Sequence, residues 1–430
     1  MMKVYEKVYN YYIQQMKEDG LKPGDKLPSI RECERILSVS RTSVETAYLQ
    51  LMADGYIYSV EKVGYFCSDL FIRTTAEKKA QIDNTATDIN ENDYIYDLAT
   101  LGEDKEVSCL QLWRRYMKSA LRQEDRLLSY ATNQGEEDLR KEIASYVRKS
   151  RNIICSADDI VVGAGFQNLL QILIPLIPGE RTISFPTKEF SEGATTFKYA
   201  GFKVDYRNKE SHVIYVNPSY MTKWGEVMTM KRRHELVEHA LLNDHLIIED
   251  DYQNEFVFSP KPTPSLYAMT GGRNTAFLGS FSRVVLPSVR ISFIILPKGV
   301  RENYYELRDS FNQTASKAEQ IALGQFLRDG HLNRHIKKMR HLYEQKREVM
   351  ISSLKNTFKK DAEVYAGASG MEFAVRLYGN GLLEKIKNSK VKVNILESNE
   401  NSILMLVSCG RIPIENIESA IKKLNDSLQN

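Results

Sequence analysis

Cysteine is scarce in this chain of 430 residues, and its five cysteines are scattered without a CxxC pair. This spacing argues against a disulfide framework or a zinc site and suits a reducing cytosol. Long apolar runs are also missing: no stretch reaches about 18 residues, and the N-terminus has no apolar signal-peptide core. We therefore expect a cytoplasmic protein that does not cross a membrane. The net charge of +3 is too small to indicate a nucleic-acid partner by itself.

The first 70 residues predict three helices followed by a β-hairpin. Apolar residues recur at helical spacing in residues 4–16, 30–37 and 44–51, and the third stripe includes Tyr48. A hairpin is expected over residues 56–67, because two runs rich in aromatic and β-branched residues flank a short turn. Three helices and a hairpin are the order of a winged helix-turn-helix domain. In that domain the third helix enters the DNA major groove and the wing contacts the adjacent DNA.

Side chains able to bind DNA cluster where the second and third predicted helices begin and at the tip of the hairpin. Hydroxyl and guanidinium groups at a helix start can bind phosphates, and those of the third helix can also reach base edges. Some of these hydroxyls have a second possible role, because Ser40 or Thr42 could cap the third helix and Glu45 fits a capping box with Thr42. The candidate DNA contacts are Ser29, Arg31, Ser40, Arg41, Thr42, Ser43, Lys62 and Gly64.

This N-terminal segment closely resembles the DNA-binding domain of GntR-type regulators. The resemblance rests on residues 27–31, 39–44 and 51–57, which read LPSIR, VSRTSV and LMADGYI. By that likeness Tyr48 also lies at or near the DNA. Acidic and basic residues in the segment nearly balance, so we expect dimerisation to supply much of the affinity for a double-stranded operator.

After a polar stretch at residues 71–92, which is typical of a linker, the pattern of the chain changes. Apolar runs of strand length alternate with helical stretches, which predicts an α/β domain with a mostly parallel sheet covered by helices. Further on, the chain becomes helical and then predicts short strands, as in a smaller α+β lobe. We therefore expect a DNA-binding domain at 1–70 and a second domain at 93–430. Its large lobe would span about 115–310 and its small lobe about 311–430.

Nearly the whole chain resembles the MocR subfamily of GntR regulators, in which a winged helix-turn-helix precedes a fold-type I aminotransferase-like domain. The matching segments are Tyr130–Gly135, Ile247–Tyr252 and Arg334–Arg340. The resemblance implies a domain-swapped, head-to-tail homodimer that binds an operator and whose large domain senses a small-molecule effector.

The aminotransferase-like domain implies a pocket for pyridoxal phosphate. By the resemblance, Asp250 pairs with the protonated pyridine nitrogen and Tyr252 bonds the ring hydroxyl. Asp250 also ends an apolar strand, the usual place for a ligand group in an open α/β sheet, although an acid there can simply cap a loop. Phe190 is expected either to stack on the ring or to belong to the core. Tyr130 is expected to reach the phosphate of the other subunit.

The phosphate would lie at the start of the helix that follows residues 160–162, where backbone N–H groups form an anion site. This helix is opened by Gly165, Phe166 and Gln167. By the resemblance, the phosphate shell is completed by Ser280, Ser282 and Arg290, the last in a bidentate contact.

Three departures from the family pattern fall in this pocket. Arg283 stands where the family has the lysine that forms an imine with the cofactor, and a guanidinium stays protonated and cannot form one. Leu406 occupies the position of the family's arginine for a substrate carboxylate, unless a slipped register brings in Arg411. The loop 217–225 lacks the family's Pro-Thr-Gly ending, although its Lys223 offers an amine.

The sequence therefore indicates a DNA-binding transcription regulator whose aminotransferase-like domain is catalytically inactive. That domain would sense a small anionic ligand or mediate dimerisation, and pyridoxal phosphate would bind it only non-covalently. Arg283 would hold an anion or form an internal ion pair with Asp250. Two alternatives stay open. One is a pyridoxal-phosphate-dependent aminotransferase, or a regulator responding to non-covalent cofactor; the other is a dimeric repressor without a ligand.

Overall fold

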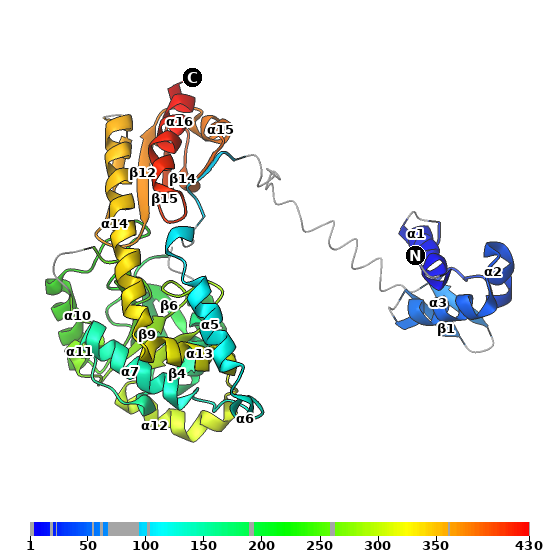
Figure 1. The fold of residues 1–430 in the computed structure, drawn as a ribbon, viewed down its shortest axis with the longest axis horizontal. Coiled ribbons are helices and arrows are strands. Elements are labelled where there is room, and N and C mark those ends of the chain that lie inside the picture. The colour runs from blue at the N-terminus through cyan, green and yellow to red at the C-terminus, as the bar shows by residue number, and fades with distance from the viewer. Residues whose placement is uncertain are drawn as a thin grey trace. The chain divides into compact units, whose positions relative to one another are not determined.

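The computed structural model describes residues 4–17, 20–22, 24–53, 56–60, 63–67, 94–100, 104–188, 193–258, 263–359 and 362–429. It divides the chain into two compact units, Met1–Asn90 and Glu91–Asn430. In Figure 1 the first unit is blue and the second runs from cyan to red. The expected linker at 71–92 lies outside the described residues.

The N-terminal unit, called the head below, has the expected order of three helices and a hairpin. It consists of α1 (Val4–Lys17), α2 (Ile30–Leu37), α3 (Arg41–Ala53) and an antiparallel pair, β1 (Ile57–Val60) with β2 (Gly64–Cys67). Side chains from all three helices form its core, because the apolar stripes of the helices face one another. The best-buried members include Val8, Tyr12, Cys33, Val44, Tyr48 and Leu51.

A seven-stranded sheet organises the large lobe of the second unit. Its strand order is β4-β10-β9-β8-β7-β5-β6, in which β10 is antiparallel to both neighbours and the remaining pairs are parallel. This confirms the expected mostly parallel sheet. The strands are β4 (Ile160–Gly163), β5 (Thr182–Phe185), β6 (Lys203–Tyr206), β7 (Val213–Val216), β8 (Leu246–Asp250), β9 (Thr275–Ser280) and β10 (Ser292–Ile295).

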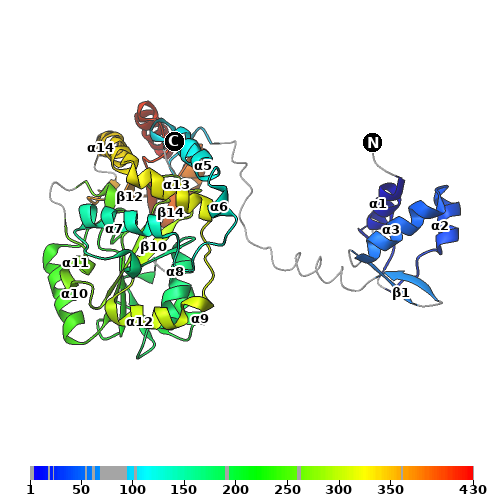
Figure 2. The same cartoon turned by 60° about the horizontal axis from the view of Figure 1, so that its bottom comes forward.

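Helices cover both faces of this sheet, and the strand residues alternate between the two faces. Val162 packs in a core with α7 and α13, whereas its neighbour Val161 packs in a separate core with α8 and α12. Figure 2 shows helices on both sides of the sheet. The helices of the lobe are α5 (Leu110–Ala120), α6 (Glu124–Leu127), α7 (Glu137–Arg151), α8 (Phe166–Leu173), α9 (Ala194–Tyr199), α10 (Met230–Leu242), α11 (Leu266–Thr270), α12 (Lys298–Leu307) and α13 (Lys317–Arg328).

The small lobe is an antiparallel sheet backed by helices. Its strand order is β11-β12-β15-β14, and the long helix α14 runs from the large lobe into this lobe (Figure 1). A two-residue strand soon after the linker, β3 (Tyr96–Asp97), pairs with β13 (Val391–Lys392) and so ties the start of the unit to the small lobe. The elements are α14 (His331–Phe358), β11 (Ala362–Tyr365), β12 (Glu372–Tyr378), α15 (Leu382–Asn388), β14 (Asn394–Ser398), β15 (Ser402–Ser408) and α16 (Ile417–Gln429).

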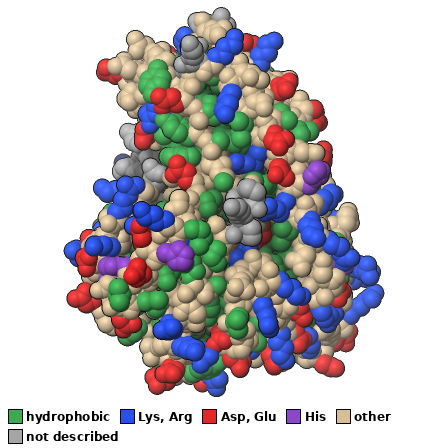
Figure 3. Space-filling model, turned by 90° about the vertical axis from the view of Figure 1, so that its left-hand side faces the viewer, with side chains coloured by type: hydrophobic (Ala, Val, Ile, Leu, Met, Phe, Trp, Pro, Cys, Tyr) green, Lys and Arg blue, Asp and Glu red, His purple; other side chains and the backbone are tan. Residues whose placement is uncertain are grey.

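Charges of both signs are mixed on one face of the second unit. On the face in Figure 3, basic and acidic side chains are interspersed with hydrophobic ones. None of the helices in the described part of the chain combines the length and the apolar character needed to span a membrane.

Candidate functional site

The candidate DNA-contacting residues of the head gather at the starts of α2 and α3 and in the hairpin. Ser29 caps α2, since its hydroxyl accepts a hydrogen bond from the backbone N–H of Glu32 at 3.3 Å and its own N–H donates to the Glu32 carboxylate at 3.0 Å. Arg31 is exposed on the same helix. Gly64 begins β2 with a φ of +135°, a conformation that other residues rarely adopt. Lys62 lies outside the described residues.

The start of α3 presents an exposed basic group. Ser40 caps this helix, because its hydroxyl accepts a hydrogen bond from the backbone N–H of Ser43 at 3.4 Å. Thr42 does not serve as the cap and is exposed on the surface. Glu45 does not complete a capping box with Thr42, because its carboxylate pairs with the Arg41 guanidinium at 2.9 Å. Because an ion pair exposed to solvent contributes little free energy, Arg41 can leave Glu45 and bind a phosphate or a base edge at a small free-energy cost.

Tyr48 does not reach the surface of the head. It is 1% exposed, and its hydroxyl lies 2.9 Å from the carbonyl oxygen of Pro28 and 3.2 Å from the hydroxyl of Tyr12. The expectation that Tyr48 lies at the DNA is therefore wrong. The residue instead fastens α3 to α1 and to the segment before α2.

Substituting Tyr48 with phenylalanine tests this structural role. The change removes a buried hydroxyl with two partners, so we expect the head to lose about 1 kcal/mol of unfolding free energy. Denaturant unfolding followed by circular dichroism measures that loss, and fluorescence anisotropy with operator DNA at low temperature measures binding of the folded protein. A large loss of DNA affinity in the folded variant would return Tyr48 to the interface.

A cavity of about 620 Å³ opens in the second unit where β7, β8 and β9 end. Residues of the small lobe, including Glu372 and Leu406, complete its wall. Ligands of open α/β sheets bind at this edge of the strands. Seven of the residues that the sequence predicted to hold the ligand line the cavity: Phe166, Asp250, Tyr252, Ser280, Ser282, Arg283 and Arg290.

One end of the cavity brings together a guanidinium and the N-terminus of a helix, two groups to which anions bind. Gly165 precedes α8 with a φ of +97°, and a Cβ placed there would lie 2.8 Å from a guanidinium nitrogen of Arg290. Glycine at this position therefore lets Arg290 lie against the N-terminus of α8, where the helix dipole also favours negative charge. Ser280 and Ser282 line the same cavity. Gln167 is exposed and is not among the lining residues.

The strand ends supply a carboxylate and a phenol. Asp250 is 7% exposed, and its carboxylate accepts a hydrogen bond from the Tyr215 hydroxyl at 2.5 Å. Burial and the neighbouring Asp250 charge raise the pKa of Tyr252, so this phenol stays protonated and can donate. A buried carboxylate beside a phenol donor fits a protonated ring nitrogen and a ring hydroxyl. Phe190, expected either to stack on the ring or to belong to the core, lies outside the described residues.

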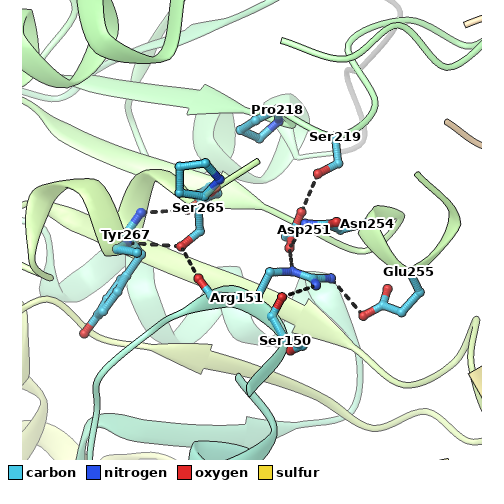
Figure 4. Close-up of polar contacts among 12 residues, drawn as sticks. Ser150, Arg151, Pro218, Ser219, Asp251, Asn254, Glu255, Ser265 and Tyr267 are labelled. Atoms are coloured by element: carbon cyan, nitrogen blue, oxygen red, sulfur yellow. Dashed lines mark hydrogen bonds and ion pairs between the residues drawn. The ribbon is translucent and has the colours of Figure 1, made fainter. Parts of the chain in front are cut away.

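Asp251, the next residue, belongs to a separate network that fixes this strand end. Figure 4 shows its carboxylate between the Ser219 hydroxyl, at 2.7 Å, and the Arg151 guanidinium, which also bonds Glu255 at 3.0 Å. Asn254 donates to the same Asp251 carboxylate at 3.2 Å. The two consecutive aspartates therefore have different roles. Asp251 links the end of β8 to α7 through Arg151, whereas Asp250 lines the cavity.

Arg283 points its charge at the small lobe. Its guanidinium lies 3.5 Å from the Glu372 carboxylate of β12, with side-chain exposures of 22% and 2%. Burial is the largest influence and by itself would lower the pKa of Arg283. The Glu372 charge and the neighbouring Tyr252 and Tyr220 together outweigh it, so the pKa lies above its ordinary value. The ion pair expected from the sequence was with Asp250; the structure gives Glu372 instead. A permanently charged guanidinium cannot supply the nucleophilic amine of imine chemistry.

The remaining pocket expectations have mixed outcomes. Leu406 lines the cavity, whereas Arg411 is exposed on a turn and is not among the lining residues, so no slipped register brings it in. Lys223, the loop residue that offers an amine, lines the cavity. Tyr130 is 102% exposed and is not among the lining residues of this chain. Sequence reasoning missed Glu372, whose only signal was an acid at the start of a mostly apolar strand.

Two family models account for most of the chain. Residues 4–67 match the model described as bacterial regulatory proteins, gntR family, and residues 88–424 match the model described as aminotransferase class I and II. The first match covers the head and the second covers the lobes that form the cavity.

Similar proteins carry the same combination. The HTH-type transcriptional regulator YhdI of Bacillus subtilis (strain 168) is 31% identical over 399 residues, which cover 87% of this chain and 83% of that protein. The probable rhizopine catabolism regulatory protein MocR of Rhizobium meliloti is 24% identical over 386 residues, covering 83% and 78%. Among solved structures, the α-aminoadipate aminotransferase LysN of Thermus thermophilus has a TM-score of 0.65 at 17% identity, covering 77% of this chain and 92% of that one.

The structural likeness to LysN shows the fold of the second unit and not its activity. The relatives that match most of this chain, from the head through the second unit, are transcriptional regulators. A GntR-type helix-turn-helix head joined to an aminotransferase class I and II domain makes this chain a member of the MocR/GntR family of DNA-binding transcription regulators.

Proposed function

We propose that the aminotransferase-like domain of this regulator is a catalytically inactive sensor that binds pyridoxal phosphate, or a similar ring phosphate, without a covalent bond. The observation that carries this proposal is Arg283, which stands on the cavity wall, stays charged and pairs with Glu372. Transamination needs a neutral amine that captures the cofactor aldehyde, and a guanidinium cannot provide it.

The other cavity residues fit such a ligand without that amine. Arg290 and the N-terminus of α8 would hold the phosphate, Asp250 the ring nitrogen and Tyr252 the ring hydroxyl. When bound, the group would supply an electron-poor ring, but this chain lacks the amine at position 283 that would use it. The free energy of ligand binding would then shift the equilibrium between arrangements of the two lobes, rather than lower the barrier of a transamination.

The active regulator is proposed to be a cytoplasmic, domain-swapped, head-to-tail homodimer. The fully exposed Tyr130 supports this arrangement, because a tyrosine left wholly in water is suited to a place in the partner's cavity. Two heads on one dimer would bind two operator half-sites, and a change of lobe closure on ligand binding would alter their spacing.

DNA binding measured with and without ligand tests this function. The full chain is titrated onto its operator, selected from random DNA, at fixed salt, with and without pyridoxal phosphate. We expect pyridoxal phosphate to change the operator affinity measurably, and the same compound with the phosphate removed to have little effect. An unchanged affinity together with an unchanged thermal midpoint would contradict a sensor role and favour the ligand-free repressor. An amino-group transfer catalysed by the wild-type chain would favour the aminotransferase.

A further inference from the structure

Lys223 is a cation on the cavity wall with no partner among the described residues. Three cationic side chains line the cavity in the described part of the chain: Lys223, Arg283 and Arg290. Arg283 is paired with Glu372, and Arg290 lies at the N-terminus of α8, where the anion end is. The Lys223 ammonium makes no hydrogen bond or ion pair with any other described residue. An ammonium without a protein partner, on a residue that lines a cavity, is suited to bind an acid group of a ligand.

The loop that carries Lys223 is held in place against the small lobe. The Tyr220 hydroxyl donates to the Lys223 carbonyl oxygen at 2.6 Å, and the N–H of Gly367 donates to the Trp224 carbonyl at 2.8 Å. Gly225 has a φ of +82°, and a Cβ there would lie 1.7 Å from the Ser369 carbonyl oxygen. Glycine alone permits this close approach of the two backbones. The loop therefore presents Lys223 from a fixed base.

The wall contributed by the small-lobe sheet offers no competing cation. Leu406 pairs in the sheet with Ala374 and Asn394, and it clusters with Leu404 and Leu396 in an apolar patch. The leucine side chains cannot pair with a carboxylate, and burying a carboxylate unpaired against them is costly. The Asn394 amide lines the same wall, but it carries no charge and already donates to the Ala99 carbonyl oxygen at 2.9 Å.

Glu372 disfavours the binding of a ligand acid group near Arg283. Its carboxylate is 1% exposed and one of its oxygens, Oε1, has no hydrogen bond, although Arg283 lies 3.5 Å away. The pair is neutral in sum, so a ligand carboxylate placed there would meet a negative charge as closely as a positive one. Of the three cations, Lys223 is the one left for a second anionic group.

We infer that Lys223 binds an acid group of the effector, so that the ligand of this site has two negative poles. One pole is the phosphate held by Arg290, and the other is a carboxylate or comparable acid on the substituent that reaches the small lobe. The inference rests on the proposed function, because it adds the second group to the same site. Lys223 thereby determines specificity and forms no covalent bond to the ligand.

Two compounds that differ by one carboxylate test this assignment. N-(5′-phosphopyridoxyl)-L-leucine and N-(5′-phosphopyridoxyl)-3-methylbutylamine share the ring, the phosphate and the apolar chain, and neither has an aldehyde that a lysine could capture. Calorimetric titration of the full-length protein should show the leucine compound binding about tenfold more tightly, as a charged hydrogen bond predicts. In Lys223→Gln the ratio of the two affinities should fall to near one, whereas Lys231→Gln, exposed on α10, should keep it.

The possible failures are distinguishable. Equal affinities in the wild-type chain, or a preference for the leucine compound that survives Lys223→Gln, would overturn the role of Lys223 while leaving the ring-phosphate site intact. A preference that survives Lys223→Gln but disappears in Arg283→Met would assign the acid to Arg283. Failure of both compounds to bind would overturn the proposed sensor site together with this assignment. Operator binding by each variant confirms that it is folded.

Discussion

Arg41→Ala is expected to weaken operator binding by about a hundredfold, roughly tenfold for each of the two heads of a dimer. Arg41 is the first residue of α3, and its side chain is 59% exposed. The helix that follows it would lie in the major groove, so the guanidinium is placed for a bidentate contact with a base edge or a phosphate. Anisotropy titrations at one fixed salt concentration measure the change.

Two further variants separate a direct contact from a general effect of charge. Lys355→Ala removes one positive charge from the exposed surface of α14 and should leave the affinity within about twofold. Glu45→Gln releases Arg41 from its carboxylate partner, so it should strengthen DNA binding. An affinity that Arg41→Ala leaves unchanged would mean that another element of the head makes the specific contacts.

Arg283→Lys is expected to let the protein capture pyridoxal phosphate covalently. The introduced amine would stand at the cavity position that Arg283 occupies, on the same cavity as Asp250 and Tyr252. Glu372 would hold that amine in its protonated, unreactive form, because a neighbouring carboxylate favours the charged state. We therefore expect weak capture by the single variant and near-complete capture when Glu372→Gln is added. Borohydride reduction followed by peptide mass spectrometry measures it.

A matched substitution guards against nonspecific labelling. Arg328→Lys adds a lysine on the exposed surface of α13 and should give no stable label at that position. If the double variant folds, binds the operator and still captures no pyridoxal phosphate, then residue 283 does not face the ligand aldehyde. The proposed orientation of the ring phosphate in the cavity would then be wrong.

Local sequence patterns predicted the helices and strands of this fold well. They predicted the contacts between individual side chains less well. Tyr48 shows the difference: its helical spacing with Val44 and Leu51 already indicated the core, whereas the family resemblance suggested the DNA. Spacing reports which face of a helix an apolar ring covers, so it was the more direct physical signal. The identity of the residue alone does not distinguish a tyrosine in the core from a tyrosine at a DNA interface.

Arg283 and Glu372 show a second limit. The loss of imine chemistry could be predicted from Arg283 alone, because it follows from the chemistry of one side chain. Its partner Glu372 could not be predicted, because the start of β12 approaches the turn after β9 only when the two lobes come together. The same is true of Lys223, whose place on the cavity depends on the contact of its loop with residues 367–369 of the small lobe.

The central claim is that the wild-type cavity binds its ring phosphate without a covalent bond. The most direct measurement is to incubate the purified full-length protein with excess pyridoxal phosphate, reduce it with borohydride, and map the labelled peptides by mass spectrometry. We predict no stoichiometric label on any residue that lines the cavity. Stoichiometric labelling of Lys223, the lysine among those lining residues, would contradict the account and restore an enzyme-like site.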